Sequence, residues 1–407
     1  MNKTPAVRFS GFYQEWDHSK LSDLFQNIGN AFVGTATPYY VEQGHFYLES
    51  NNVKDGQINH NSEIFINDEF YKKQKDKWLH AGDMVMVQSG HVGHAAVIPE
   101  ELENTAAHAL IMFRGPKEEI EPYFLNYQYQ TIKSKKKFDR ITIGNTINHI
   151  LASEIQKHIV DVPCYAEQIK IANIFKLLDY LIIRHQCKYE KLVNVKKSML
   201  YKMFPQNGSK VPEIRFAGFT GDWEQRRLEE FVSFFSGLTY SPNDIRPSGT
   251  LVLRSSNVKD GEIVDADNVY VDPKIVNSQN VQNGDIIVVV RNGSRSLIGK
   301  HAEIKGVKPN TVIGAFMTGI RSKHPSFVNA LLNTPRFDKE ITINMGATIN
   351  QITGYMFSKM EFLIPSDKEQ DTIGEYFNSL DNLIILHQCK LEKLKQIKQA
   401  MLHKMFV

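Results

Sequence analysis

Cysteine is scarce in this sequence, which has three in 407 residues: Cys164, Cys187 and Cys389. Three scattered thiols cannot build a disulfide framework, and none belongs to a Cys-x-x-Cys pair of the kind that binds zinc or performs redox chemistry. This usage is typical of a reducing compartment, and we expect a cytoplasmic protein.

Long hydrophobic runs are also lacking. The longest extends only from Ile286 to Val290, whereas a helix that crosses a bilayer needs about 20 apolar residues. The first residues, MNKTPAVRFSGF, contain no apolar stretch of the kind found in a signal peptide. We therefore expect no membrane partner.

Neither sign of charge is in large excess, since 48 basic residues stand against 45 acidic ones for a net charge of +3. So small an imbalance does not by itself indicate a nucleic-acid-binding protein, and any basic surface must be local. The length is sufficient for two or more domains, each with a hydrophobic core of its own.

What the sequence does contain is a repeat of itself. HQCKYEKLVNVKKSMLYKMF at 185–204 returns as HQCKLEKLKQIKQAMLHKMF at 387–406, an offset of 202 (387 − 185). Three earlier pairs match as well: PAVRFSGFYQEW at 5–16 with PEIRFAGFTGDW at 212–223, LESNNVKDGQI at 48–58 with LRSSNVKDGEI at 253–263, and IGNTINHI at 143–150 with MGATINQI at 345–352. The whole chain is therefore a tandem duplication.

The two copies differ most in their middles. Residues 91–140 and 293–340 align poorly, although the blocks on either side align well. A scaffold that is kept while its central surfaces diverge indicates two binding domains with two different targets. Neutral drift of surface loops is the alternative explanation.

Local patterns in each copy favour strands and turns. Asp55-Gly56 and Asp260-Gly261 stand between strand-like stretches, as hairpin turns do. Residues 83–87 and 285–290 indicate buried strands that follow a Gly-Asp turn.

We predict an α+β protein with two mixed α/β domains, separated by an antiparallel pair of long coiled-coil-like helices and related by an internal pseudo-two-fold repeat. The predicted boundaries are a first domain at 1–163, a first long helix at 164–204, a linker at 205–211, a second domain at 212–365 and a second long helix at 366–407.

The period of the apolar residues changes to three and four after Pro163 and Pro365, as in a coiled coil. Each helix would be on the order of 55 Å long at 1.5 Å per residue. The predicted seam between the helices comprises Phe175, Leu178, Ile182, His185, Tyr189, Leu192, Met199, Phe377, Leu380, Ile384, His387, Leu391, Leu394 and Met401. The two seam histidines are best explained as polar residues that set the helix register.

A metal site is not expected at His185 and Cys187, because residues two apart on a helix point to different faces and cannot chelate one ion together. The repeat also makes a demand on the fold. If the helices are antiparallel, the segment Pro5 to Trp16 must pack near the end of the second helix, around Met405, as residues 212–223 do near Met203.

The opening of each helix carries a recognisable pattern. Pro163, Glu167-Gln168, Ile171 and Leu178-Asp179 recur as Pro365, Glu369-Gln370, Ile373 and Leu380-Asp381. Together with the doubled Gly-Asp strand entry and the doubled Gly-x-Thr-Ile-Asn segment, this pattern closely resembles the specificity (S) subunit of Type I restriction-modification systems. The likeness covers essentially the full length.

The resemblance implies a non-catalytic subunit with two target recognition domains, each reading one half of a bipartite target in double-stranded DNA. It implies that the helices set the unspecified spacer and dock two methyltransferase subunits, and that two restriction subunits join them. It implies no cofactor on this chain, because S-adenosylmethionine, ATP and magnesium would be used by the partner subunits. Glu49 stands in the first domain where Arg254 stands in the second, so a phosphate contact is not transferred from one to the other.

Two alternatives remain beside this interpretation: a coiled-coil adaptor without DNA readout, and a stand-alone enzyme that acts on DNA. An amino-group methyltransferase needs an Asn/Asp-Pro-Pro-aromatic loop, which Thr37-Pro-Tyr-Tyr40 does not supply. The chain also has no Walker-type Gly-x-x-x-x-Gly-Lys-Ser/Thr motif. We therefore predict no catalytic residue.

Candidate DNA contacts are side chains that can reach base edges or phosphates. The loops after the two Gly-Asp strands supply Gln88, Ser89, His91, His94, Arg291, Asn292, Ser294, Arg295, Lys300 and His301. A basic run adds Lys135, Lys136 and Lys137, with a weaker counterpart around Arg336 and Lys339; a solvated helix face is the alternative. Thr146, Asn148, Thr348 and Asn350, which are alike in both copies, more plausibly shape the domain or touch phosphate than specify bases.

Overall fold

The chain separates into two compact units in a computed structural model that describes residues 4–144, 148–206, 208–306, 308–345 and 350–406. Unit 1 comprises residues 1–185 and 390–407, and unit 2 comprises residues 186–389. Each unit therefore combines a globular domain with the first part of its own long helix and the last part of the other long helix.

Unit 1 is built on two four-stranded sheets, ordered β2-β11-β8-β9 and β10-β4-β7-β3, with the two-stranded ribbons β1-β12 and β5-β6. The strands are β1 (Asp17–Lys20), β2 (Phe25–Asn30), β3 (Tyr40–Val41), β4 (His45–Leu48), β5 (Val53–Lys54), β6 (Gln57–Ile58), β7 (Phe65–Ile66), β8 (Met84–Val87), β9 (Ala95–Val97), β10 (Ala106–Ala107), β11 (Leu110–Pro116) and β12 (Ile159–Val162). The helices are α1 (Leu21–Leu24), α2 (Asp68–Lys73), α3 (Pro122–Tyr129), α4 (Ile132–Ile141), α5 (Ala152–Lys157) and the long α6 (Tyr165–Lys202), which continues into unit 2.

Unit 2 repeats this plan with sheets ordered β14-β23-β20-β21 and β22-β16-β19-β15 and ribbons β13-β24 and β17-β18. The strands are β13 (Glu224–Arg227), β14 (Val232–Ser236), β15 (Ile245–Arg246), β16 (Thr250–Leu253), β17 (Val258–Lys259), β18 (Glu262–Ile263), β19 (Val269–Val271), β20 (Ile286–Val289), β21 (His301–Glu303), β22 (Thr311–Ile313), β23 (Met317–Ser322) and β24 (Glu361–Ile364). The helices are α7 (Pro325–Leu332), α8 (Pro335–Asn344), α9 (Gly354–Ser358) and the long α10 (Asp367–Lys404), which continues into unit 1.

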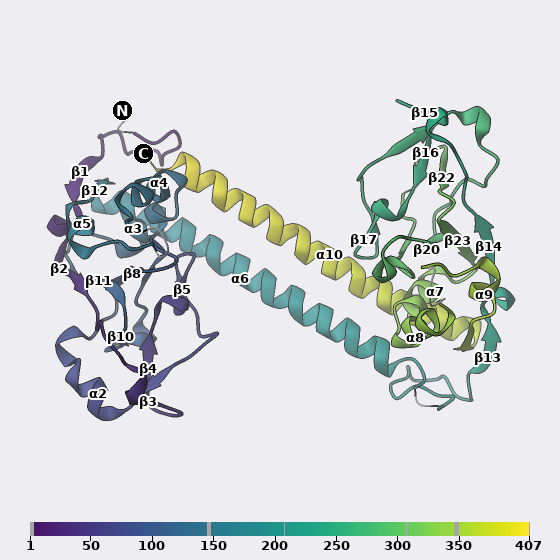
Figure 1. Ribbon diagram of the computed structural model, residues 1–407, viewed down its shortest axis with the longest axis horizontal. Helices are drawn as coiled ribbons and strands as arrows, with labels where there is room; N and C mark the ends of the chain where they lie inside the picture. Colours follow the sequence, from purple (N-terminus) through teal and green to yellow (C-terminus); the bar gives the residue numbers. More distant parts are fainter. Residues whose placement is uncertain (1–3, 145–147, 207, 307, 346–349, 407) are drawn as a thin grey trace. The chain divides into compact units, whose positions relative to one another are not determined.

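The prediction of two like domains that mix strands and short helices is confirmed, and so are the two long helices (Figure 1). The segments that align poorly in sequence, 91–140 and 293–340, nevertheless carry matching strands in matching order. In both units one pair is parallel, β4 with β10 and β16 with β22. The duplication therefore extends through the divergent middles.

The predicted hairpin turns are confirmed at Asp55-Gly56 and Asp260-Gly261, which join β5 to β6 and β17 to β18. Both residues of each turn have positive φ, 51° and 86° in the first and 52° and 79° in the second. This is the two-residue turn that matches the twist of antiparallel strands, and Asp-Gly is favoured there because Gly has no Cβ to clash.

The strands β8 and β20 are fully buried, as their sequences predict. The preceding aspartate closes the turn before each strand: Asp83 Oδ2 accepts from the His80 N–H at 2.9 Å, and Asp285 Oδ2 accepts from the Gln282 N–H at 2.8 Å. Burial raises the pKa of Asp83, whereas Asp285 receives a bidentate contact from Arg321 at 2.7 and 2.8 Å. The Gly-Asp motif is therefore structural.

The end of α10 completes the core of unit 1. Phe406 packs against Trp16, Phe124 and Phe175, with ring centroids 6.2, 5.4 and 5.8 Å away. Removing so large a buried side chain typically costs about 3–5 kcal/mol. The core of the domain therefore depends on a segment more than two hundred residues further along the chain.

The end of α6 does the same in unit 2. Phe204 packs against Trp223, Phe327 and Phe377, with centroids 5.9, 5.8 and 6.1 Å away. The four aromatic positions are those of unit 1, carried over by the repeat. Each long helix thus ends inside the domain of the other half.

Within each unit the two helices run antiparallel and are joined by one matching ion pair. In unit 1, Asp179 of α6 meets Lys398 of α10 at 2.6 Å; in unit 2, Asp381 of α10 meets Lys196 of α6 at 2.5 Å. Both pairs are largely buried, so they fix the register of the helices. The aspartates belong to the Leu-Asp motif, whose role the sequence did not disclose.

The expected contact of residues 5–16 with the end of the second helix is confirmed. The Val7 N–H donates to the Lys404 carbonyl at 2.9 Å. In the second copy the Ile214 N–H donates to the Lys202 carbonyl, also at 2.9 Å. The next residue in the chain, Arg8, forms a bidentate contact with the fully buried Glu167, with both distances 2.7 Å.

The partner pair in unit 2 is Arg215 with Glu369, at 2.8 and 2.8 Å. The neighbouring glutamines donate to the prolines that precede each helix: Gln168 Nε2 to the Pro163 carbonyl at 2.9 Å and Gln370 Nε2 to the Pro365 carbonyl at 3.0 Å. The Glu-Gln motif therefore fastens the start of each long helix to the chain around it.

Candidate nucleic-acid interface

The predicted contact loops occupy the same place in both units, the connection between the last two strands of the sheets β2-β11-β8-β9 and β14-β23-β20-β21. Gln88, Ser89, His91 and His94 lie between β8 and β9. Arg291, Asn292, Ser294, Arg295 and Lys300 lie between β20 and β21, with a 3-10 turn at Arg295–Leu297. We call these the first and second reading loops.

Each reading loop is held by the segment that follows the basic helix. In unit 1 the Ser89 hydroxyl contacts His149 Nδ1 at 2.6 Å and the Gly90 N–H donates to the Asn148 carbonyl at 3.0 Å. In unit 2 the Asn292 N–H donates to the Asn350 carbonyl at 3.2 Å. Asn148 and Asn350 thus shape the loops, whereas Thr146 and Thr348 lie outside the described residues.

The far end of each reading loop touches the Asp-Gly hairpin. His94 Nδ1 accepts from the Asp55 N–H at 3.3 Å, and Lys300 Nζ donates to the Val258 carbonyl at 3.3 Å. Burial is the largest cause that lowers the pKa of His94, although Asp55 opposes it. The histidine is therefore a neutral acceptor near pH 7.

The hairpin itself is fixed by a buried asparagine in each unit. Asn52 Nδ2 donates to the carbonyls of Asn59 and Ser62, and Asn257 Nδ2 donates to those of Val264 and Ala266. The repeated Asn-Val-Lys-Asp-Gly motif is therefore explained by its own backbone contacts, while its lysines, Lys54 and Lys259, are exposed.

Several predicted contacts are accessible. His91, Arg291, Ser294 and Arg295 are exposed, whereas Gln88, Ser89 and Asn292 are half-buried. The guanidinium of Arg291 lies 5.0 Å above the ring of Phe316. Phe316 itself is 53% exposed and is absent from the predicted contacts. In the sequence it stands between Gly314 and Gly319, far from the basic loop, so the sequence does not indicate that the two lie together.

His301 does not fit the predicted contact set. It is only 9% exposed, its Nδ1 lies 2.9 Å from the Gly299 carbonyl oxygen, and its ring meets Phe337 edge-on. Burial lowers its pKa. Because β21 begins at this residue and turns the side chain into the core, we remove His301 from the contacts proposed below.

The basic run of unit 1 forms helix α4. Lys135 and Lys136 are exposed, while Lys137 lies 3.9 Å from the Asp161 carboxylate. The helix is capped by Thr131, whose hydroxyl accepts from the Ser134 N–H at 3.2 Å. Two of the three predicted lysines therefore have side chains directed to solvent.

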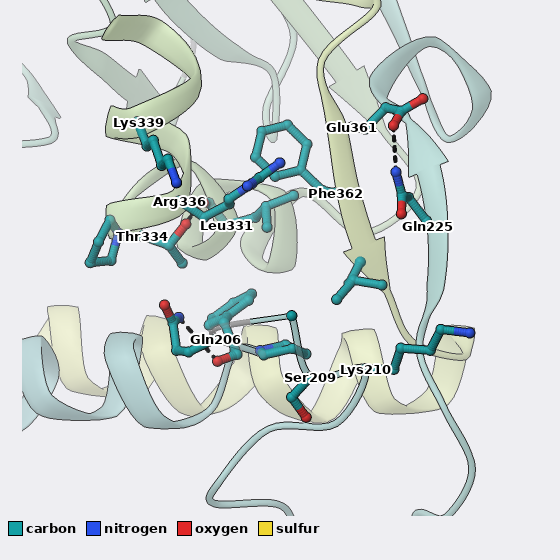
Figure 2. A pocket seen from close by; sticks show the side chains of 15 residues that line it. Gln206, Ser209, Lys210, Gln225, Leu331, Thr334, Arg336, Lys339, Glu361 and Phe362 are labelled. Atoms are coloured by element: carbon teal, nitrogen blue, oxygen red, sulfur yellow. Dashed lines mark hydrogen bonds between the residues drawn. The ribbon is translucent and has the colours of Figure 1, made fainter. Parts of the chain in front are cut away.

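The corresponding helix of unit 2, α8, borders a hollow of about 480 Å³. Arg336 and Lys339 line it from above in Figure 2, and Gln206, Ser209 and Lys210 of the linker line it from below. Arg336 Nη2 lies 2.7 Å from Glu340, so part of this charge is already paired. Glu361 also lines the hollow, so one carboxylate stands there beside the basic Lys210, Arg336 and Lys339.

The predicted helix seam is sheltered from solvent. Each of its fourteen residues is buried or half-buried, and the buried ones are Phe175, Leu178, Phe377, Leu380 and Leu391. His185 and His387 are half-buried, while Cys187 and Cys389, two residues further on, are exposed. No group of three or more potential metal ligands gathers within the described ranges, and no helix there is long and apolar enough to cross a bilayer.

These features define a protein with two like recognition domains, in which one frame carries two different sets of loop side chains. Residues 13–193 and 220–396 match the family described as Type I restriction modification DNA specificity domain, once in each half. The chain belongs to this family of specificity subunits.

Similar proteins support this assignment. The MjaVIII specificity subunit of Methanocaldococcus jannaschii is 22% identical over 96% of this chain and 92% of its own length. The putative MjaX specificity subunit of the same organism is 25% identical with the same two coverages. The crystal structure of an S subunit from M. genitalium shares the fold, with a TM-score of 0.68, 14% identity and 99% of each chain covered.

Proposed function

We propose that each domain of this specificity subunit reads one half of a bipartite target in double-stranded DNA. The main support is that the strands of the two domains match in order, while the side chains of the reading loops differ. The first loop has Gln88, Ser89 and His91, and the second has Arg291, Asn292, Ser294 and Arg295. Repeated residues hold the loops in place, and the varied residues are left to meet the bases.

Phosphate contacts come from the basic helices in this proposal. Lys135 and Lys136 of α4, and Arg336 and Lys339 of α8, would neutralise the DNA backbone without reading sequence. Such contacts set affinity and salt dependence, whereas the loops set specificity. The small net charge of +3 is compatible with this division, because the basic residues are grouped.

The two long helices would set the spacer between the half-sites and receive two methyltransferase subunits, one on each of the two equivalent faces that the repeat creates. Two restriction subunits would complete a cytoplasmic complex. The chain itself would perform no catalytic step and bind no cofactor; S-adenosylmethionine, ATP and magnesium would belong to the partner subunits. The MjaVIII and MjaX relatives are both named specificity subunits, which supports a role as one subunit of a larger complex.

The test is an exchange of one reading domain. Residues 30–140 are replaced by the matching segment of another family member with a different target, and the methylated sequences are determined in the host genome. We expect only the first half-site to change, with the second half-site and the spacer retained. An unchanged methylation sequence would favour an adaptor without DNA readout, and methyl transfer by the purified chain alone would favour a stand-alone enzyme.

A further inference from the structure

One position in the frame carries opposite charges in the two domains. Arg254 follows β16, and its N–H donates to Asn257 Oδ1 at 2.9 Å; Glu49 follows β4, and its N–H donates to Asn52 Oδ1 at 3.0 Å. Because the backbone is held in the same way in both domains, the two side chains start from equivalent positions. The two positions therefore differ in the charge and shape of the side chain and not in the backbone that carries it.

In unit 2 this position opens onto a pocket of about 550 Å³. Arg254, Ser255, Tyr240 and Phe316 are among the residues that line it. The pocket adjoins the second reading loop, because Asn292 Nδ2 donates to the Ser255 hydroxyl at 3.0 Å and Arg291 lies on the Phe316 ring. It is thus placed where a base contacted by that loop would lie.

In unit 1 the equivalent space is filled. His108 stands where unit 2 has Gly314: the His108 N–H donates to the Leu48 carbonyl at 2.9 Å, and the Gly314 N–H to the Leu253 carbonyl at 2.8 Å. The His108 ring lies 3.0 Å from Glu49 Oε1, which also accepts from the Tyr40 hydroxyl at 2.8 Å. The Glu49 carboxylate is already satisfied inside its own domain.

Arg254 is satisfied less completely. Its Nη2 donates to the Asp267 carbonyl at 2.6 Å, while its buried Nε has no acceptor among the residues that the structure describes. It takes part in none of the ion pairs found within the same ranges. A planar fork of donors beside an exposed aromatic ring suits a flat ligand that presents two acceptors.

We propose that this pocket reads a guanine of the second half-site through its major-groove edge, with Arg254 donating to O6 and N7 and Phe316 forming the wall beside the base. Guanine is the base whose edge presents two adjacent acceptors, and arginine is its commonest partner. Asp267 also lines the pocket, and its negative charge disfavours a phosphate there. The inference rests on the proposed function, because it assumes that the second domain reads DNA.

The test uses the full chain with its methyltransferase partners on a DNA library in which every base of the second half-site is varied. For the native complex we expect one position at which G·C is required. Arg254→Gln should reduce the preference for G·C at that position by about ten- to hundredfold, with the other positions and the first half-site unchanged. Gly314→His, whose Cβ would lie 3.7 Å from Arg254 Cγ and whose ring would occupy the pocket as His108 does in unit 1, should have the same effect with the arginine retained.

Arg226→Gln is the matched control, since this arginine lies on β13 and contacts the Glu230 carbonyl within its own segment. It should leave all preferences intact. A loss that is equal for every sequence would mean that Arg254 contacts phosphate, and unchanged preferences in both pocket variants would mean that the pocket reads nothing; either overturns the inference. If the domain exchange above fails to move a half-site, the proposed function has failed instead.

Discussion

At the residue scale, the positions repeated in both halves mostly serve the frame. Asn52 and Asn257 hold a hairpin, Asp83 and Asp285 close a turn, and the paired Arg8 and Glu167 fasten the start of a long helix. The repeat made these residues easy to notice in the sequence. Their partners could not be predicted, because Arg8 and Glu167 are 159 positions apart and only the folded chain brings them together.

His158 gives unit 1 a defined sensitivity to acid. Burial is the largest cause that lowers its pKa from 6.5 to about 4, and Lys137 adds to the effect while Asp161 opposes it. Between those pH values the unfolded chain binds a proton that the folded chain does not, so the free energy of unfolding falls as the pH drops through this range.

We expect the free energy of unfolding of the His158→Gln variant to fall less on acidification than that of the native chain, by up to about 2–3 kcal/mol. The measurement is urea unfolding of the native and variant chains at pH 7.5 and pH 5, followed by tryptophan fluorescence. His60→Gln is the control, since this side chain is 51% exposed, pairs with Glu63 and lies against the ring of Phe46. A variant that loses as much stability on acidification as the native chain would contradict the expectation.

At the scale of elements, strands and helices with strong local signals could be predicted, and elements fixed by distant pairing could not. The sequence alone predicts the hairpins at the Asp-Gly turns, the buried strand at 285–290 and the long helices with heptad-like spacing. The small sheet β10-β4-β7-β3 is built from strands of two to four residues, too short to leave a pattern. His301 was misassigned because a loop residue and the first residue of a strand look alike in sequence.

The long helices allow a direct test of the spacer. The division of the chain into units falls between His185 and Gln186 in α6 and between Cys389 and Lys390 in α10. Seven residues inserted at both junctions should preserve the ion pairs Asp179–Lys398 and Asp381–Lys196, because each pair lies within one unit. Seven residues add about 10.5 Å of helix, or roughly three base pairs at 3.4 Å each.

We therefore expect the recognised spacer to lengthen by about three base pairs while both half-sites stay the same. Sequencing of methylated bases in a host that carries the variant reads all three quantities at once. An insertion in α6 alone is the control and should abolish assembly, since it shifts one seam against the other. An unchanged spacer would argue that the domains dock directly on one another.

At the scale of the whole molecule, the reciprocal helix ends decide how the chain holds together. Phe406 closes the core of unit 1 and Phe204 closes that of unit 2. The sequence predicted that the N-terminal segment would meet the end of the second helix. It did not reveal the aromatic cluster, because the four rings come from four separate stretches of the chain.

A chain of residues 1–206 should therefore form a dimer of identical halves. On its own it lacks Phe406, but its own helix ends in Leu200, Met203 and Phe204, which match Leu402, Met405 and Phe406. In a dimer, the helix end of each copy can pack into the core of the other copy. Light scattering after gel filtration should give twice the mass of the half chain. Phe204→Glu should abolish the dimer. A folded monomer of the half chain would contradict the expected exchange of helix ends.

The shared helix end has a consequence for how such proteins diversify. Each domain needs from the other half the end of one long helix, with its lysine (Lys398 or Lys196) and the segment Met-Leu-x-Lys-Met-Phe. A domain with new loops can therefore be inherited next to any other that keeps this ending. The number of recognisable sequences then grows as the product of the available first and second halves. A gene that exchanges one half by recombination acquires a new combination in a single step, with no change to its core.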